Sequence, residues 1–357
     1  MNAIEWLTPE ENGVWDAFVA QHPLGLIYHL SAWQEVLETA FKHIRGRILV
    51  LREPRGQIRA GLPVYNITSW LLKNRTVSVP FATLCDPLVS SKEDLNLLWR
   101  GIENAAVKNR SKRVEIRTRR LGAANIPEFL APNARYKHHY LPLDKDTKTL
   151  LNSFHPSCVS RRIKKARREG LLVEERHDAE SLRVFHSIMA STRRRLLLPP
   201  MPYAFFEAMF DVLRPDRASL YLTIHEGQPI AGMLALKFNG MWTSEYSGHI
   251  ENAHSCADQC LYWSVIERAK ESGAQFFSFG RTSLDNTGLL EYKQRWATIE
   301  EDLVDYVRYL DGTPVPAEEE ESTHSVNPVL YSAARLIRYA PVSIQQKFGD
   351  FCYRHLG

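Results

Sequence analysis

Apolar residues recur at helical spacing soon after the start of the chain. Trp33, Val36, Leu37 and Phe41 follow Ser31, a residue type that caps helix N-termini, and together they predict a helix over residues 31–43. Strand-like runs and one amphipathic helix make up the rest of the first half. The predicted strands are 45–53, 57–67, 113–118 and 136–143, with a turn at PRGQ (54–57), and the predicted helix is 92–109.

The second half repeats this order of elements without repeating the residues. A basic helix ends at Gly170, where glycine favours termination. Three strand-like runs then follow one another through EGQ and NG, which are hairpin signals. The predicted helices are 159–170, 179–196, 203–214 and 256–273, and the predicted strands are 171–176, 218–226, 228–238, 241–249, 276–280 and 301–310.

Each half therefore carries helices, antiparallel strands, a central helix and one further strand. This is the order of an α+β domain of the GNAT type. A length of 357 residues is also more than one hydrophobic core usually serves. We predict an α+β fold with two tandem GNAT-like domains, residues 1–145 and 146–312. Residues 313–357 would form an acidic linker and C-terminal helices that pack back.

The tail carries a stripe of apolar residues with arginines opposite, in helices broken at Pro341. An amphipathic stripe of this kind fits a helix packed on the domain or a helix lying on a membrane surface. We favour the packed helix. The stripe consists of Leu330, Ala333, Leu336, Ile337 and Ala340.

Composition describes an ordinary globular protein, with 44% hydrophobic and 24% charged residues. The sequence shows neither a secretory signal nor an apolar run of the roughly 20 residues needed to cross a bilayer. The cysteines are odd in number, and none of their spacings completes a zinc site. We predict reduced, structural thiols, no metal, and a cytoplasmic protein with membrane-peripheral contact left open. The cysteines are Cys85, Cys158, Cys256, Cys260 and Cys352.

Two neighbouring stretches, FGRT (279–282) and GLLEYKQRW (288–296), carry the strongest family signal. With weaker segments between residues 28 and 298, they resemble the FemAB family of tandem-GNAT aminoacyltransferases, known for building peptidoglycan cross-bridges. They are also similar to its BioF2-like acetyltransferase branch. The weaker segments include HLSAWQEVLETAFKH, FHPSCVSRRIKKARREGLLVE, TRRRLLLPPMPYAFFEAMF and GQPIAGMLAL.

The resemblance implies roles for individual residues. In the family, a lysine in an aromatic-Lys-x-x-aromatic-Gly pattern lies in the transfer channel and stabilises charge on the reacting carbonyl. Lys293 and the adjacent Tyr292 match the catalytic part of this pattern, and Trp296 matches a substrate-binding position. Ala297 departs from it, because the family has glycine there. The coiled-coil arm of some cross-bridge enzymes is also missing.

The residues alone leave two interpretations of Lys293. Acyl transfer to an amine passes through a tetrahedral species with a negative oxygen, and a fixed cation aimed at that oxygen is an effective catalytic device. Alternatively, Lys293 is a surface lysine while Tyr292 and Trp296 pack inward. Spacing alone favours the surface interpretation, because lysine is rarely buried. The resemblance reverses that preference.

Four further residues are candidate substrate-binding positions. Arg281 and Asp285 flank the end of a strand, and Arg281 can bind a phosphate or carboxylate or pair with Asp285. Glu245 and His249 alternate onto one face of a predicted strand, where either can act as a general base for the amine.

Basic residues are concentrated in two places. RRIKKARR (161–168) is almost continuously cationic, and TRRR (192–195) adds three arginines. Such runs are usually solvated helix faces, but this density also suits an anionic partner such as tRNA phosphates. We slightly favour phosphate contact. The candidates are Arg161, Arg162, Lys164, Lys165, Arg167, Arg168, Arg193, Arg194 and Arg195.

The sequence lacks a glycine-rich turn that would indicate CoA as the acyl donor. Ordinary acetyl-CoA enzymes of the GNAT class hold the pyrophosphate with a glycine-rich turn before the central helix, where backbone N–H groups approach the phosphates. The equivalent stretch, IENAHSCADQCLYW, contains no glycine, which favours a donor carried on a larger molecule.

We therefore predict an acyltransferase that needs no cofactor and joins an aminoacyl group, carried by tRNA, to an amine of a peptide, sugar or lipid-linked precursor. One alternative is an acyl-CoA- or carrier-protein-dependent N-acyltransferase in cell-surface modification. The other is a non-catalytic phosphate-binding module on a GNAT scaffold.

Overall fold

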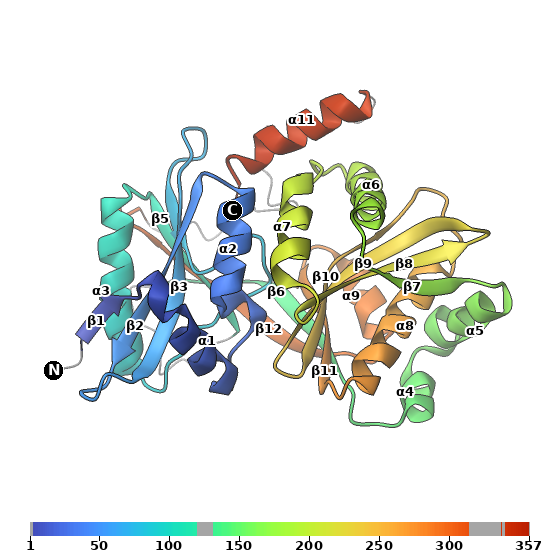
Figure 1. The fold of residues 1–357 in the computed structure, drawn as a ribbon, viewed down its shortest axis with the longest axis horizontal. Coiled ribbons are helices and arrows are strands. Elements are labelled where there is room, and N and C mark those ends of the chain that lie inside the picture. The colour runs from blue at the N-terminus through green and yellow to red at the C-terminus, as the bar shows by residue number, and fades with distance from the viewer. Residues whose placement is uncertain (1–2, 120–130, 314–336, 338–339, 357) are drawn as a thin grey trace. The chain divides into compact units, whose positions relative to one another are not determined.

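The computed structural model describes residues 3–119, 131–313, 337 and 340–356. The chain forms two compact units (Figure 1). Unit 1 consists of Met1–Tyr136, Glu301–Glu320 and Tyr353–Gly357, and unit 2 consists of Lys137–Glu300 and Glu321–Cys352. Sequence order had placed residues 301–312 in the second domain, whereas the strand they form pairs within unit 1.

Unit 1 has the strand order β1-β2-β3-β4-β5-β12. All neighbouring strands are antiparallel except β4 and β5, which are parallel and joined through helix α3. The elements are β1 (Ala3–Trp6), α1 (Asn12–Gln21), α2 (Ser31–Ala40), β2 (Ile44–Arg52), β3 (Ile58–Ile67), β4 (Arg75–Val77), α3 (Lys92–Lys108), β5 (Arg113–Arg119) and β12 (Ile299–Tyr309), with short 3-10 turns at Pro9–Glu11 and Ile27–His29.

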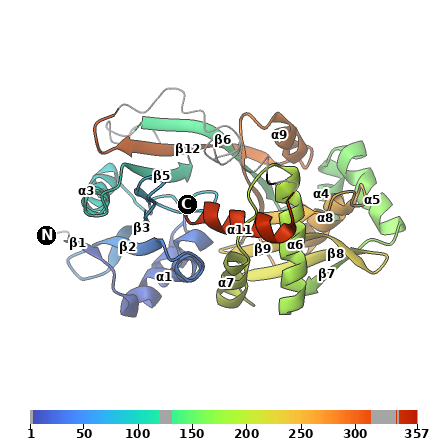
Figure 2. The same ribbon diagram turned by 90° about the horizontal axis from the view of Figure 1, so that it is seen from above.

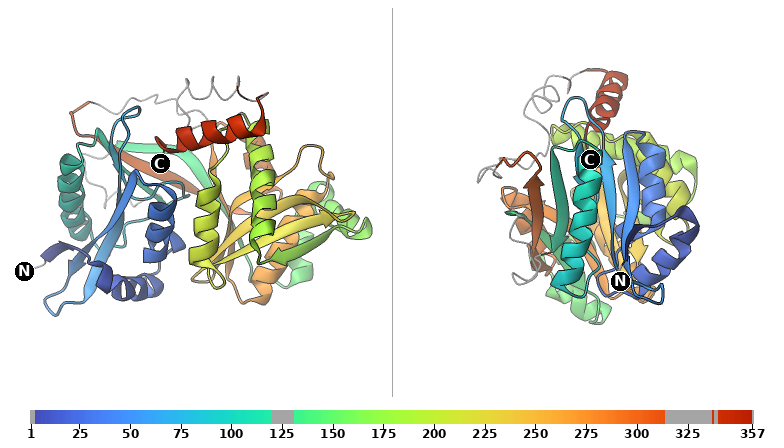
Figure 3. Two further views of the ribbon diagram at one scale, coloured as in Figure 1. Left: turned by 45° about the horizontal axis from the view of Figure 1, so that its top comes forward. Right: turned by 90° about the vertical axis from the view of Figure 1, so that its left-hand side faces the viewer.

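Helices cover both faces of the unit 1 sheet, with α3 on one face and α1 and α2 on the other (Figure 3). Two glycines allow the close packing: a Cβ on Gly101 of α3 would lie 2.6 Å from the Leu49 side chain, and one on Gly61 would lie 2.5 Å from the ring of Trp15. Alternate residues of β2 can therefore pack against helices on the two opposite faces of the sheet.

The C-terminal residues pack on unit 1. The ring of Tyr353 lies 5.3 Å from that of Phe81. The carbonyl of His355 accepts a hydrogen bond from Arg75, and its ring hydrogen-bonds the hydroxyl of Ser69. This end of the tail thus packs on unit 1.

Unit 2 has the strand order β6-β11-β10-β9-β8-β7. Strands β7 to β10 form an antiparallel series, and β10 pairs with β11 in parallel through the crossover helix α8. The elements are β6 (Ala131–Pro142), α4 (Thr147–Ser153), a π-helical turn (Pro156–Ser160), α5 (Arg161–Arg168), β7 (Leu172–Arg176), α6 (Ala179–Arg195), α7 (Tyr203–Leu213), β8 (Ala218–His225), β9 (Gln228–Phe238), β10 (Met241–His249), α8 (Ala257–Glu271), β11 (Phe276–Ser283), α9 (Thr287–Gln294) and α11 (Val342–Tyr353).

Local chemistry fixes the hairpins of unit 2. Glu226 and Gly227 have φ of 50° and 76°, and Asn239 and Gly240 have φ of 50° and 74°. Two successive positive φ values are required by the tight turns that match strand twist. The hairpins predicted from EGQ and NG are therefore confirmed.

The unit 2 sheet separates two helical layers (Figure 2). Tyr246 of β10 stacks edge-on against Phe205 and Phe206 of α7. The next residue, Ser247, hydrogen-bonds the hydroxyl of Tyr262 on α8 at 2.8 Å. Successive strand residues point to opposite faces, so α6 and α7 cover one face and α8 the other.

The tail differs in part from the expected helices. α11 begins at Val342, directly after Pro341, where the sequence predicted a break. Of the expected apolar stripe, Leu330, Ala333 and Leu336 lie outside the described residues. No helix in the described part of the chain is long and apolar enough to cross a membrane.

Candidate functional site

Strands β10 and β11 pair over only part of their length. The parallel pairing joins Met241–Thr243 to Phe276–Ser278, although β10 continues to His249 and β11 to Ser283. Beyond this short ladder the two strands are no longer paired with each other. Several of the predicted site residues lie on these segments and on α9, the helix that follows β11.

Lys293 is the buried residue of α9, with 5% of its side chain exposed. Its Nζ donates to the backbone carbonyls of Gly280 and Arg281, both at 3.1 Å. Successive carbonyls of a regular strand point in opposite directions. Gly280 has φ of +71°, a conformation that suits glycine, and this local irregularity lets both carbonyls reach one amine. The surface interpretation of Lys293 was wrong.

Burial decides the charge state of Lys293. Desolvation lowers its pKa to about 7, while the carboxylate of Glu245 acts in the opposite direction. The buried imidazole of His139 is held neutral, because burial and then the charge of Lys293 lower its pKa to about 3. In its protonated form the amine carries three N–H donors, and the two carbonyls occupy two of them. The third donor of the protonated form is available to an oxygen on a substrate.

An aromatic cluster surrounds this segment. The fully buried ring of Trp296 lies 5.2 Å from Phe154, 5.7 Å from Tyr262 and 5.7 Å from Phe279. Within α9, Leu289 is exposed and Leu290 half-exposed, so they do not enclose Lys293. The aromatic residues come instead from α8, from β11 and from Phe154, directly after α4.

Tyr292 lies beside the cluster, with its ring 6.3 Å from that of Tyr262. Burial raises the pKa of its hydroxyl well above the ordinary value, so the group stays protonated. That hydroxyl is enclosed and has no hydrogen-bond partner among the described residues.

Ala297 takes up a backbone conformation typical of glycine, with φ of +54°. The turn still forms, since the amide of Ala297 donates to Gln294 and the hydroxyl of Thr298 donates to the carbonyl of Lys293. The departure from the family pattern therefore strains the turn without removing it.

We expect Ala297→Gly to raise the free energy of unfolding by about 0.5–1 kcal/mol, because glycine adopts positive φ without the steric penalty of a Cβ. Denaturant unfolding of the two proteins measures the difference. Ala274→Gly, at an alanine without positive φ, is the matched control, and we expect it to be neutral or destabilising.

His249 is oriented by a residue that the sequence did not single out. Its Nδ1 lies 3.0 Å from Oδ1 of Asp258, in the first turn of α8. Its backbone pairs with the hydroxyl of Thr192. The only sequence signal for Asp258 was an acidic residue at the start of a predicted helix, a common feature of helices.

Asp258 also affects which acyl donor can bind at the start of α8. The first turn of α8 is where a GNAT enzyme of the ordinary kind would present backbone N–H groups to a pyrophosphate. Here that turn carries a carboxylate and follows a stretch without glycine. Both features disfavour a diphosphate at this helix end.

Arg281 and Asp285 are held by the end of β11. Arg281 is half-buried, and its carbonyl is one of the two that bind Lys293. Asp285 is exposed, and its carboxylate accepts a hydrogen bond from Ser283 at 3.4 Å. The segment thus connects the strand with α9.

The basic residues of α5 are all exposed, and some are engaged locally. Arg162 donates to the carbonyl of Ser255, Arg167 pairs with Glu267, and Lys165 lies 3.9 Å from Glu169. Arg161, Lys164 and Arg168 have spacing i, i+3 and i+7, so they form one stripe on the helix.

The arginines at the end of α6 have local partners. Arg193 donates to the carbonyl of Pro199, Arg194 lies 3.5 Å from Glu251, and Arg195 donates to the carbonyl of His249. With Arg162, two of these arginines approach residues 249–255, the connection between β10 and α8.

Two of the thiols are poorly suited to nucleophilic chemistry. Cys260 and Cys352 are buried, and burial raises the pKa of the first to about 11 and of the second to about 12. Within the described ranges, no three His, Cys, Asp or Glu side chains are grouped to hold a metal ion.

Lys293 should make stability depend on pH. The folded protein releases the Lys293 proton near pH 7, whereas an unfolded lysine keeps its proton to about pH 10.4. Between these values the unfolded state binds more protons, so stability rises with pH. We expect the wild type to gain roughly 2–4 kcal/mol relative to Lys293→Met between pH 7 and 10. Unfolding titrations at each pH measure this, and the exposed Lys148→Met is the control. Equal pH profiles would contradict a neutralised buried amine.

Comparison with known proteins identifies the fold. Residues 157–294 match the acetyltransferase (GNAT) domain. The chain has a tandem-GNAT fold. It is similar to FemX, with 17% identity and a TM-score of 0.68 over 87% of this chain and 98% of that one. No curated protein matches it in sequence.

Two other solved structures share the tandem-GNAT fold. One is a tandem GNAT protein from the clavulanic acid biosynthesis pathway, with 13% identity and a TM-score of 0.57 over 88% of this chain and all of that one. The other is the C-terminal domain of a putative lysylphosphatidylglycerol synthetase from Agrobacterium fabrum, with 11% identity and a TM-score of 0.54 over 84% and 92%. The predicted fold is confirmed, and the chain carries an acyltransferase domain of the GNAT type.

Proposed function

We propose that this protein is a FemAB-like acyltransferase that joins an aminoacyl group carried by tRNA to an amine. The observation that carries the proposal is Lys293, a buried amine fixed by two carbonyls at the end of β11, which in its protonated form has one N–H left for substrate. In this arrangement no side chain has to reorganise when charge develops on the substrate.

The chemistry balances without a further reactant. The amine nitrogen bonds to the acyl carbon, and the carbonyl oxygen becomes negative in the tetrahedral intermediate. Lys293 donates to that oxygen. The ester C–O bond then breaks, and the ribose oxygen takes up a proton while the former amine loses one.

His249 is our candidate for the group that accepts the amine proton. Asp258 holds its Nδ1, so Nε2 is the nitrogen that faces a substrate. Glu245 is the second candidate, because its charge acts on Lys293. Tyr292, Trp296, Arg281 and Asp285 complete the proposed site, with roles in positioning the acyl group.

Two features support a tRNA-borne donor over CoA. The start of α8 lacks glycine and carries Asp258. The α5 stripe of Arg161, Lys164 and Arg168 offers cations to a phosphate backbone. Among structures of this fold, one is named as a lysylphosphatidylglycerol synthetase, a name that denotes aminoacyl transfer to a lipid. We propose a cytoplasmic enzyme with an acceptor in a peptide, sugar or lipid-linked precursor.

A CoA- or carrier-protein-dependent N-acyltransferase is the second candidate. The match of residues 157–294 to an acetyltransferase domain favours it. Calorimetry with acetyl-CoA separates the two candidate functions, because we expect saturable binding of acetyl-CoA only for the second.

The donor is tested by amide formation with radiolabelled aminoacyl-tRNA and a panel of peptide, amino-sugar and aminolipid acceptors. We expect product, lost after RNase treatment. Arg161→Gln/Lys164→Gln/Arg168→Gln should weaken tRNA binding about tenfold or more, because three phosphate contacts are lost. The slope of log K against log salt concentration should become shallower by up to roughly two units. The triple variant Arg55→Gln/Lys145→Gln/Lys148→Gln removes three exposed cations elsewhere and should behave as the wild type. Activity that survives RNase would contradict a tRNA donor.

A further inference from the structure

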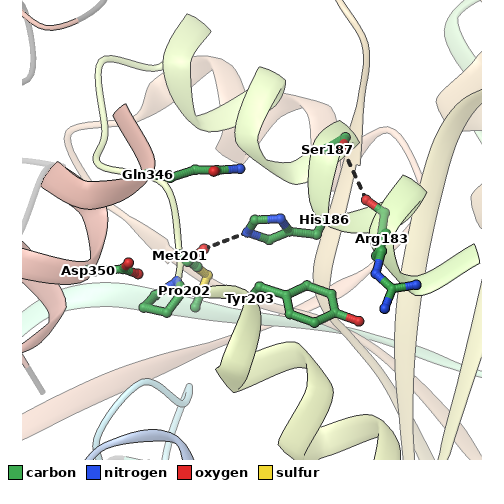
Figure 4. A pocket seen from close by; sticks show the side chains of 8 residues that line it. All are labelled: Arg183, His186, Ser187, Met201, Pro202, Tyr203, Gln346 and Asp350. Atoms are coloured by element: carbon green, nitrogen blue, oxygen red, sulfur yellow. Dashed lines mark hydrogen bonds between the residues drawn. The ribbon is translucent and has the colours of Figure 1, made fainter. Parts of the chain in front are cut away.

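Unit 2 contains a hollow of about 320 Å³ away from Lys293. It lies among α6, α7 and α11, on the sheet face opposite α8 and α9, and Figure 3 shows α11 beside α6. Its volume is that of a site for a small ligand. The lining residues are Arg183, His186, Ser187, Met201, Pro202, Tyr203, Gln346 and Asp350 (Figure 4).

The α11 wall of this hollow is held by close packing. A Cβ on Gly349 would lie 2.3 Å from the carbonyl oxygen of Pro200, so only glycine lets α11 approach the α6–α7 connection this closely. Gln345 anchors the start of the helix by donating to the carbonyl of Ala340 at 2.8 Å. Gln346 and Asp350, one helical turn apart, therefore face the hollow from a fixed wall.

His186 places a hydrogen-bond acceptor inside. Its Nε2 lies 2.9 Å from the carbonyl oxygen of Met201. A carbonyl can only accept, so Nε2 carries the proton, and Nδ1 of the neutral ring is an acceptor. The side chain is 7% exposed, and no other described residue bonds Nδ1. Figure 4 shows this nitrogen on the side of the ring that faces Gln346.

Opposite charges stand at the two ends. Arg183 lies at one end and Asp350 at the other, with His186 and Tyr203 between them (Figure 4). Both charged residues are exposed, and neither forms an ion pair with another described residue. A ligand that reaches both residues must carry a negative charge at one end and a positive charge at the other.

We propose that this hollow binds a short peptide of two or three residues with free ends. Its carboxylate pairs with Arg183 and its ammonium group with Asp350. A peptide N–H donates to Nδ1 of His186, and the Gln346 amide pairs with the same peptide group. The site is separate from the proposed transfer site, because the sheet lies between them.

Calorimetry with L-alanyl-L-alanine tests the site. We expect saturable binding that is at least tenfold weaker for the N-acetylated dipeptide, for the C-terminal amide and for free alanine. Arg183→Gln should abolish the preference for the free carboxylate, and Asp350→Asn should abolish the preference for the free ammonium group. Lys293→Met should bind the dipeptide as the wild type does, which keeps this result independent of the proposed function.

Arg55→Gln and Asp144→Asn change exposed charges elsewhere and serve as matched controls. Gly349→Val displaces α11 and should also weaken binding at least tenfold. Three results would overturn the proposal: no heat at about 10 mM dipeptide, equal binding of free and blocked dipeptides, or unchanged preferences in Arg183→Gln and Asp350→Asn.

Discussion

Lys293→Met is expected to lower turnover by roughly 10²–10³-fold while the protein stays folded. Methionine has a similar length but no N–H, so the oxygen that becomes negative loses its donor. The carbonyls of Gly280 and Arg281 lose the amine as well. Because burying the amine is itself unfavourable to folding, we expect the loss to fall on the chemical step rather than on the fold.

Stability supplies the second readout for this variant. Burial lowers the pKa of Lys293 to about 7, so keeping the amine there is unfavourable to folding near neutral pH. We expect Lys293→Met to be at least as stable as the wild type at pH 7. A protein that is both stable and inactive separates a catalytic role from a structural one.

Single-turnover rates with aminoacyl-tRNA measure the effect, and circular dichroism checks the fold. Lys148→Met, an exposed lysine on α4, is the matched control and should keep the wild-type rate. Unchanged turnover in Lys293→Met would show that the transfer reaction does not depend on this amine.

Trp296→Ala is expected to destabilise unit 2 by about 3–5 kcal/mol. The indole is fully buried and touches the rings of Phe154, Tyr262 and Phe279, so its removal leaves a cavity that rigid aromatic neighbours fill poorly. Water entering that cavity would also raise the pKa of Lys293 toward the ordinary value.

The midpoint and slope of the denaturant unfolding curve give the loss of free energy of unfolding. Trp70→Ala removes a tryptophan that is 75% exposed and should change stability by less than about 1 kcal/mol. If both variants lost the same stability, the aromatic cluster would not be what holds α9 against β11.

Local sequence patterns predicted most of the elements because their causes are local. The turn at Asn239 and Gly240 needs two positive φ values, and Asn-Gly supplies them at little cost. The end of α5 follows from Gly170, with φ of +74°. Such features depend on neighbours along the chain, so one sequence suffices to predict them.

The site was predicted less completely. The sequence indicated a catalytic role for Lys293 only through a family resemblance, because residue spacing alone favoured a surface lysine. Asp258 was missed, because an acid in a first helical turn is too common to indicate its contact with His249. The hollow beside α11 was missed as well, since its wall requires Gly349 to meet Pro200.

The sequence by itself determined the order of helices and strands, the hairpins and the tandem-domain pattern, since these rest on periodicity and turn chemistry. Only the tertiary structure decided that Lys293 is buried, that its amine is held by two carbonyls of β11, and that its pKa is lowered to about 7. Desolvation depends on every atom that surrounds a group. For Lys293 those atoms come from segments far apart in the chain, and folding alone brings them together.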